Sequence, residues 1–247
     1  MRLLVFSDVH ANATALEAAL QACAGSWDHA ICLGDVVGYG PDPNKVIERV
    51  RPLVSAIIRG NHDKAVSGIT DPEEFNPVAR TAVEWTRTQL TPENLRYLVG
   101  LPSGPIEANG VVLVHGAVED EDEYVFSADQ ALPGLLASPR SLTFFGHTHI
   151  PGGFSYNGSA VERIDLSLGR GKASDTITLD PKARYLLNPG SVGQPRDGDP
   201  RAAFAIADLE KRTVEFWRTS YDIASVQRRM EQFGAPEASI LRLGFGR

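Results

Sequence analysis

Histidine and aspartate gather in five short clusters within the first 149 residues of this 247-residue chain. Five of its six histidines lie in them. Each cluster comes at, or just after, the end of an apolar run typical of a strand, where ligand sites collect in α/β sheets. Neighbouring strands would therefore bring these side chains into one place. The clusters are Asp8-Val9-His10, Gly34-Asp35, Gly60-Asn61-His62-Asp63, His115-Gly116 and Gly146-His147-Thr148-His149.

The donor types in these clusters indicate a metal site. Asp, Asn and His offer carboxylate, amide and imidazole donors without a thiolate. This set favours Mn, Fe, Zn, Co or Ni over Ca, and over a structural cysteine–zinc site. We expect Asp8 with His10, and His147 with His149, each to present alternate side chains on one face of an extended segment.

Seven candidate ligands are too many for one ion that keeps an open position. They suit two divalent ions that share a carboxylate, lie about 3.5–4 Å apart, clamp a phosphate and share a hydroxide nucleophile. Two such ions, two carboxylates and the hydroxide leave the site positive by about one unit, although the chain carries a formal charge of −7. Asn61 preserves this charge, which an aspartate there would cancel. The seven are Asp8, His10, Asp35, Asn61, His115, His147 and His149.

Composition excludes several other classes of protein. With 43% apolar residues the chain is too hydrophobic for disorder, and its length suits a single domain over 1–247. The negative charge argues against coating nucleic acid or binding anionic membranes. Cys23 and Cys32 have no CxxC spacing and suit a reducing compartment. The apolar run at 3–6 is far too short for a signal peptide or a membrane span. We therefore expect a cytoplasmic protein.

Apolar runs and turn residues predict the elements that position the clusters. Early strands and helices alternate, which is typical of a parallel sheet with crossover helices. Asn12 is placed to cap the first helix. We expect one α/β domain made of two packed sheets with helices outside. The expected strands are 2–7, 29–33, 53–58, 111–115, 142–145, 154–156, 161–165, 176–179, 184–188, 202–208 and 213–217, and the expected helical stretches are 12–24, 44–50, 72–100 and, as the last, 223–233.

In this order the motifs resemble those of the calcineurin-like metallophosphoesterase superfamily. A later segment, Asn188-Pro189-Gly190-Ser191-Val192-Gly193-Gln194-Pro195-Arg196, is similar to the C-terminal signature of its small bacterial and archaeal members. Five motifs in order are far more specific than any one of them. The resemblance implies a β-sandwich of two mixed sheets flanked by helices, and a phosphoesterase that depends on two metal ions.

The resemblance also implies a role for each motif residue. Asp35 would bridge the two ions. His62, which is not a ligand in the family, would contact the phosphate and protonate the leaving group. Manganese is the ion we favour in vitro. The first ion would be held by Asp8, His10 and His149, and the second by Asn61, His115 and His147.

The second motif departs from the serine/threonine protein phosphatases of the superfamily. Where they continue Asp-Arg-Gly, this chain has Gly38-Tyr39-Gly40, without the carboxylate that orients the catalytic histidine or the arginine that grips phosphate. The stretch 34–41 resembles instead small members that include phosphodiesterases and diadenosine tetraphosphate hydrolases. We expect cleavage of a phosphodiester or a nucleotide phosphoanhydride. The alternatives are a protein phosphatase, a phosphomonoesterase, or a non-catalytic metal-binding scaffold for protein partners.

Three further residues are candidates for contact with a small phosphorylated substrate such as a nucleotide. Arg59 precedes the third motif and Arg196 ends the C-terminal signature, and a planar guanidinium grips phosphate oxygens well. Tyr39 offers a ring on which a base could stack. The alternatives are a solvated surface position for each arginine and core or rim packing for the tyrosine. The sequence assigns no oligomeric state.

Overall fold

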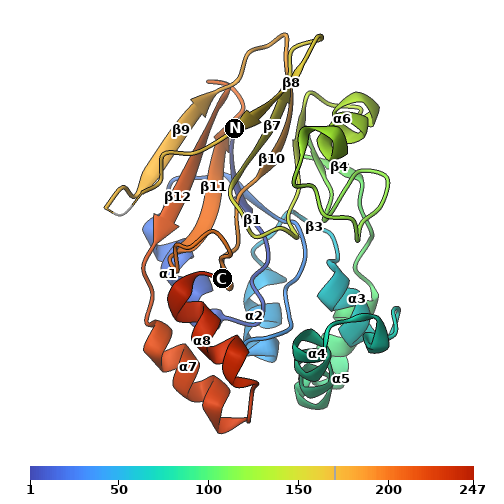
Figure 1. Ribbon diagram of the computed structural model, residues 1–247, viewed down its shortest axis with the longest axis vertical. Coiled ribbons are helices and arrows are strands. Elements are labelled where there is room, and N and C mark those ends of the chain that lie inside the picture. Colours follow the sequence, from blue (N-terminus) through green and yellow to red (C-terminus); the bar gives the residue numbers. More distant parts are fainter. Residues whose placement is uncertain (170) are drawn as a thin grey trace.

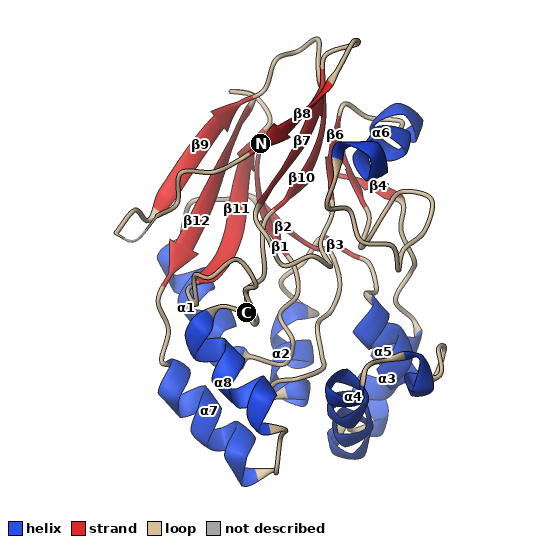
Figure 2. Cartoon of the chain, viewed as in Figure 1, coloured by secondary structure: helices blue, strands red, loops and turns tan. Residues whose placement is uncertain are grey.

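The computed structural model describes residues 1–169 and 171–247 and arranges them around two facing sheets (Figures 1 and 2). In the described residues each sheet has six strands, and each mixes parallel with antiparallel pairs. The α/β sandwich of two mixed sheets is therefore confirmed. In spatial order, the first sheet is β3 (Ala56–Ile57), β2 (His29–Cys32), β1 (Arg2–Phe6), β11 (Ala202–Asp208), β12 (Thr213–Thr219) and β9 (Ser174–Thr178), and the second is β4 (Ile106–Ala108), β5 (Val111–Leu113), β6 (Leu142–Phe144), β10 (Arg184–Asn188), β7 (Gly152–Tyr156) and β8 (Val161–Ile164).

Helices cover the outer faces and one end of the sandwich. Figure 1 shows several of them gathered beyond the end of the sheets toward which β1 runs. Asn12 caps the first helix as expected, because its Oδ1 accepts a hydrogen bond from the N–H of Ala15 at 3.0 Å. The helices are α1 (Ala13–Ala22), α2 (Pro43–Val50), α3 (Asn61–Ser67), α4 (Pro77–Gln89), α5 (Pro92–Val99), α6 (Ala128–Ala137), α7 (Ile223–Gln232) and α8 (Glu237–Phe245), with a 3-10 turn at Pro72–Glu74.

Strand β1 is buried on both faces. Leu3 and Val5 belong to the core between the two sheets, whereas Leu4 and Phe6 pack with the helices outside. All four side chains are at most 2% exposed. This position explains why residues 3–6 of β1 form an unbroken apolar run rather than an alternation of apolar and polar residues.

Several elements differ from the expectation. The strand expected at 53–58 is only β3, because the N–H groups of Leu53 and Val54 turn back to the carbonyl of Val50 at 2.9 and 3.2 Å. The helix expected to be the last is followed by α8. Three elements have no counterpart among the expected ones. They are α3, which begins inside the third motif, β4, and α6, whose apolar pattern is interrupted by Pro133.

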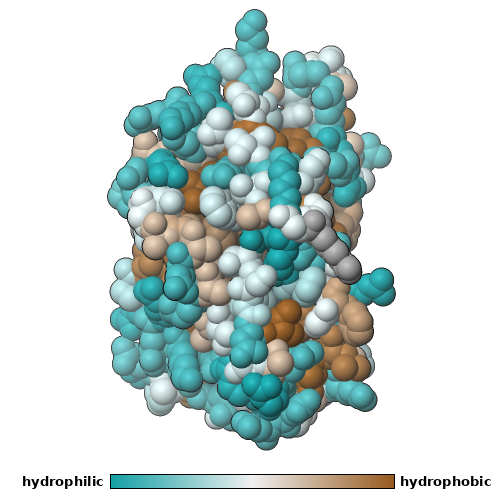
Figure 3. All heavy atoms as spheres, turned by 90° about the vertical axis from the view of Figure 1, so that its left-hand side faces the viewer, coloured by the Kyte–Doolittle hydropathy of each residue, from teal (hydrophilic) through white to brown (hydrophobic). Residues whose placement is uncertain are grey.

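None of the helices in the described part of the chain has the length and apolar character that crossing a membrane requires. The face drawn in Figure 3 is mostly hydrophilic, with hydrophobic residues in small patches. The cellular compartment stays a prediction.

Candidate functional site

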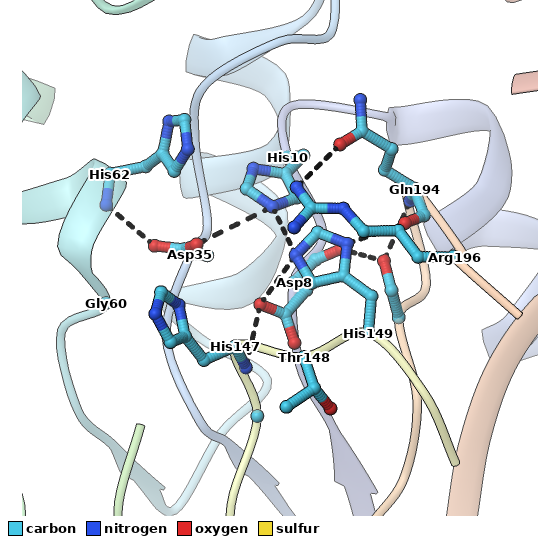
Figure 4. A network of polar contacts seen from close by, with 12 residues as sticks. Asp8, His10, Asp35, Gly60, His62, His147, Thr148, His149, Gln194 and Arg196 are labelled. Atoms are coloured by element: carbon cyan, nitrogen blue, oxygen red, sulfur yellow. Dashed lines mark hydrogen bonds and ion pairs between the residues drawn. The ribbon is translucent and has the colours of Figure 1, made fainter. Parts of the chain in front are cut away.

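The five motifs meet at one end of the two sheets. They lie in the loops after β1, β2, β5 and β6 and in the first turn of α3 (Figure 4). Backbone hydrogen bonds join the loops to one another. The N–H of Asp8 donates to the carbonyl of Gly34 at 3.0 Å, and that of His10 donates to Asp35 at 2.9 Å. The convergence that strand ends predicted is therefore present.

Four side chains form a first group of potential ligands. One donor atom from each of Asp8, His10, Asp35 and His149 lies within 4.8 Å of the others. All four residues are at most 1% exposed. His149 Nε2 lies 3.3 Å from Asp8 Oδ1, and His10 Nε2 lies 3.5 Å from Asp35 Oδ2. These donors surround one small volume from several loops.

A second group shares Asp35 with the first. Donor atoms of Asp35, His115 and His147 also lie within 4.8 Å of one another. His115 Nε2 is 3.5 Å from Asp35 Oδ2 and 3.2 Å from Asn61 Oδ1. Asp35 is the only residue common to both groups among the described residues. Its carboxylate has the position that a bridging ligand needs.

The two carboxylates of the site are held in their charged form. Burial alone would raise the pKa of Asp35, but the neighbouring His115 and His62 outweigh it and keep that pKa well below its usual range. Burial also opposes ionisation of Asp8, and His149 outweighs it in the same way, so the pKa of Asp8 is lowered. Both groups are therefore anionic and available to a cation.

The pKa values of the buried histidines shift in opposite directions. Burial lowers the pKa of His147 to about 3 and the pKa of His62 to about 4. Burial acts on His115 as well, but Asp35 outweighs it and raises the pKa of His115 to about 10. The rings of His147 and His62 are therefore neutral, whereas His115 balances the charge of Asp35 in the protein without metal.

The site suits a cation better than it suits hydrogen bonds. His10 Nε2 and His149 Nε2 face each other at 3.2 Å. In the described part of the chain, the buried Asp8 Oδ2 has no hydrogen-bond partner. A buried polar atom without a partner costs about 1–3 kcal/mol, and a divalent ion would use these atoms as ligands. The residues present therefore fit the metal centre that the donor types predicted.

Backbone carbonyls orient three of the imidazoles. The Nδ1 atoms of His10, His115 and His149 lie 3.1, 2.8 and 2.6 Å from the carbonyl oxygens of Val37, Leu33 and Gln194 respectively. A proton on each Nδ1 would be held there. The Nε2 atom of each ring is then directed into the site, which is how proteins commonly prepare histidine for a metal. A metal ion would displace the second proton that His115 carries in its absence.

The backbone of the site is left-handed where the sequence analysis expected it to be extended. Five candidate ligands have φ between 46° and 64°, so the expectation for Asp8 with His10 and for His147 with His149 was wrong. A sharp bend after the strand, rather than a two-residue alternation, directs both members of each pair into the site. Such conformations cost about 1–3 kcal/mol each and collect at functional sites. The five are Asp8, His10, Asp35, His147 and His149.

Asp63 braces two of the loops, and the sequence analysis assigned it no role. Its Oδ2 accepts hydrogen bonds from the N–H groups of Gly60 and Val36 at 3.0 and 3.2 Å, and its Oδ1 from that of Val37 at 3.1 Å. Burial and the nearby Asp35 raise the pKa of Asp63 to about 7. The carboxyl group thus ties the loop of the second motif to the start of α3.

His62 lies beside Asp35 in a setting that differs from that expected for protein phosphatases. Its backbone N–H donates to Asp35 Oδ1 at 2.9 Å. Its buried Nδ1 has no hydrogen-bond partner among the described residues. Gly38 lies against that nitrogen, since a Cβ there would be only 2.6 Å away, and glycine has no side chain to offer it a hydrogen bond. The second motif therefore places a glycine beside the His62 ring, and no carboxylate of that motif orients the ring, as its sequence led us to expect.

Tyr39 is a packing residue rather than an open platform for a base. It is only 6% exposed. Its ring lies 4.9 Å from the ring of His10 and 4.5 Å from that of His62, centroid to centroid. The core alternative for this residue is the one that its burial favours.

The two candidate arginines differ in whether a carboxylate already pairs with the guanidinium. Arg59 donates from Nε and Nη2 to the carboxylate of Glu121 at 3.2 and 2.8 Å, so its guanidinium is already engaged. Arg196 extends over the first group of ligands (Figure 4), and its Nη2 donates to Gln194 Oε1 at 3.1 Å. In the parts of the chain that the structure describes, Arg196 forms no ion pair. Of the two arginines, only Arg196 has no carboxylate partner among the described residues.

The C-terminal signature contacts the first motif directly. Ser191 Oγ donates to the carbonyl of Asp8 at 2.8 Å, and the N–H of Gly193 donates to the same oxygen at 3.0 Å. A Cβ on Gly193 would lie 1.8 Å from the carbonyl oxygen of Val9, so the close approach needs glycine. This segment supports the loop that carries Asp8.

Known proteins share this combination of motifs and fold. A sequence model of the calcineurin-like phosphoesterase superfamily domain matches residues 1–212. The chain belongs to this superfamily. The membership predicted from the motifs is therefore confirmed. Together with the buried Asp and His cluster, it makes the protein a metal-dependent phosphoesterase, a hydrolase that acts on phosphoester bonds, and it indicates divalent metal ions.

Relatives of this phosphoesterase span nearly its whole length. An uncharacterized protein of Methanocaldococcus jannaschii is 36% identical over 249 residues, covering 99% of this chain and 98% of that one. The structure of a metallophosphoesterase from Sphaerobacter thermophilus is 40% identical with a TM-score of 0.85, covering 100% and 99% of the two chains. A hypothetical protein of Pyrococcus horikoshii shares the fold at 20% identity and a TM-score of 0.79, covering 100% and 98%.

The brace formed by Asp63 leads to a testable expectation. Asp63→Asn replaces one acceptor oxygen by an amide group that cannot accept from a backbone N–H, so the loop carrying Asp35 loses a restraint. We expect Mn²⁺ affinity, measured by calorimetric titration, to fall by about 10–100-fold. Asp165→Asn, on a 77% exposed side chain, is the matched control. Unchanged Mn²⁺ affinity in Asp63→Asn would contradict the positioning role.

Proposed function

We propose that this protein hydrolyses a phosphodiester or a nucleotide phosphoanhydride with two divalent metal ions. The observation that carries the proposal is the position of Asp35, whose carboxylate belongs to both groups of ligand atoms. The first ion would lie among Asp8, His10 and His149, the second among Asn61, His115 and His147, and Asp35 would bridge them.

The bound ions would supply an activated hydroxide and positive charge for the phosphate oxygens. The residues of the chain do the rest. Asp35 keeps its negative charge because histidines surround it, and its carboxylate joins the two groups of ligands. His62 is neutral in the protein without substrate; the negative charge of a bound phosphate would raise its pKa, and the protonated ring, beside Asp35, would pass its proton to the leaving oxygen. The planar guanidinium of Arg196 meets a phosphate oxygen from the side of His149 (Figure 4).

The donor set limits the metal to a group of five ions, and the resemblance of the second motif to small members of the superfamily supports the proposed substrate class. Mn, Fe, Zn, Co and Ni all suit the donor set, and we propose Mn²⁺ for assays. Gly38 leaves the His62 ring without an orienting carboxylate, which favours small phosphodiesters and nucleotide anhydrides over phosphoproteins. A non-catalytic scaffold would have no need to keep all seven candidate ligands.

A substrate panel tests this proposal. Chelator-stripped protein, resupplied with Mn²⁺, is assayed on bis(p-nitrophenyl) phosphate, diadenosine tetraphosphate and a phosphoserine peptide. We expect metal-dependent cleavage of the diester or the dinucleotide, and none of the peptide. Cleavage of the peptide alone would favour a protein phosphatase. Absent turnover on every substrate, with and without metal, would favour the scaffold.

Two substitutions separate the proposed roles. Asp35→Asn should abolish turnover and loosen both metals, because the bridging charge is lost. His62→Ala should leave Mn²⁺ binding intact and lower kcat by about 10²–10⁴-fold, the usual contribution of a general acid. His29→Ala, an exposed histidine at the start of β2, is the control and should behave as wild type. If Asp35→Asn kept most of its activity, the bridging role would be wrong.

A further inference from the structure

A pocket adjoins the second group of ligands. Its volume is about 250 Å³, below the roughly 300–1,000 Å³ of pockets that enclose a drug-sized ligand. Asn61 and His147 form the wall that it shares with the site, and Phe75 and Tyr124 also line it. The pocket is thus sized for a single ring system and lies next to the place proposed for the phosphate.

The two aromatic side chains are braced by residues of the site. The ring of Tyr124 stacks on His147 with centroids 3.8 Å apart and an interplanar angle of 17°. Tyr124 is nonetheless 38% exposed. Phe75 meets the ring of His62 edge-on at 5.1 Å. Phe126 also lies nearly parallel to the Tyr124 ring, with centroids 5.3 Å apart. His147 and Phe126 hold the ring of Tyr124 in a fixed orientation. The exposed part of that ring faces the pocket, in contrast to the buried ring of Tyr39.

The charges around the pocket indicate which part of a substrate it accepts. Its polar lining includes the acidic Glu74 and Asp122, and no arginine or lysine among the described residues lines it. Lys64 pairs with Asp122, whereas Glu74 forms no ion pair in the described part of the chain. Arg196 instead lies over the first group of ligands (Figure 4). A further phosphate would be repelled from the pocket, whereas an uncharged ring with amino groups would be accepted.

We propose that this pocket binds the nucleobase of a nucleotide substrate, with Tyr124 and Phe75 as its stacking surfaces. The inference rests on the proposed function, because it places the nucleotide's phosphate at the two ligand groups. Aromatic side chains stack on any base, and the carboxylate of Glu74 can accept a hydrogen bond from an exocyclic amino group. The substrate class is thereby narrowed from phosphodiesters and anhydrides in general to those that carry a nucleoside.

Binding of two probes to the Mn²⁺-loaded full chain tests the proposal without requiring turnover. AMP and ribose 5-phosphate share a phosphate and a sugar, and only AMP has a base. By calorimetric titration we expect AMP to bind wild type at least about tenfold more tightly, which corresponds to about 1.4 kcal/mol. Tyr124→Ala should remove most of this difference while ribose 5-phosphate binds as before, and Tyr124→Phe should preserve it.

Two further variants keep the result interpretable. Phe75→Ala removes the other stacking surface without touching the ring of His147, so it should weaken AMP selectively even if Tyr124→Ala disturbs the metal site. Phe245→Ala removes an aromatic side chain that is 65% exposed on α8, and should change nothing.

The proposal is overturned if wild type binds AMP no better than ribose 5-phosphate, or if both aromatic variants weaken the two probes equally. Its failure is distinguishable from failure of the proposed function. A protein that binds both probes equally but cleaves the diester would be a phosphoesterase without a base pocket. One that prefers AMP but cleaves no substrate of the panel would have a base pocket without the proposed activity.

Discussion

The burial of two carboxylates and four imidazoles around one small volume is the constraint on which the rest of the structure depends. Charged groups removed from water are costly unless they are paired or coordinate a metal. In this site Asp35 and Asp8 stay anionic because imidazoles surround them, and ring nitrogens of His10 and His149 face each other at 3.2 Å. A divalent cation answers both conditions at once, since it satisfies the carboxylates and the facing nitrogens together.

The free-energy cost of burying this cluster is offset by the packing and the hydrogen bonds of the residues around it. Strands such as β1 are apolar on both faces, so the sheets that carry the motifs are anchored in two cores. At the strand ends, left-handed residues turn the ligands inward. Backbone carbonyls orient three imidazoles, and Asp63 ties the loop of Asp35 to α3. Because these contacts hold the metal ligands rigidly, the ligands lose little conformational entropy when an ion binds.

Much of the site was predictable because its residues follow strands whose ends meet at one edge of a sheet. The order of the motifs predicted the superfamily, and the resemblance to that superfamily implied two groups of ligands that share Asp35. Other features depend on contacts that no local pattern records. The left-handed φ of His10 occurs without the glycine that usually signals it. Arg59 and Arg196 both lie next to or within a motif, so the sequence made them equal candidates for contact with phosphate. Only the folded chain brings Glu121 to the guanidinium of Arg59. The pocket of Phe75 and Tyr124 likewise joins segments far apart in the sequence.

The central claim, two metal ions bridged by Asp35, is tested most directly by anomalous diffraction from crystals of the Mn²⁺-loaded protein. The account predicts two anomalous peaks about 3.5–4 Å apart. One should lie among Asp8, His10 and His149, the other should lie beside His115 and His147, and Asp35 should contact both. A single peak, or two peaks of which Asp35 contacts only one, would contradict it.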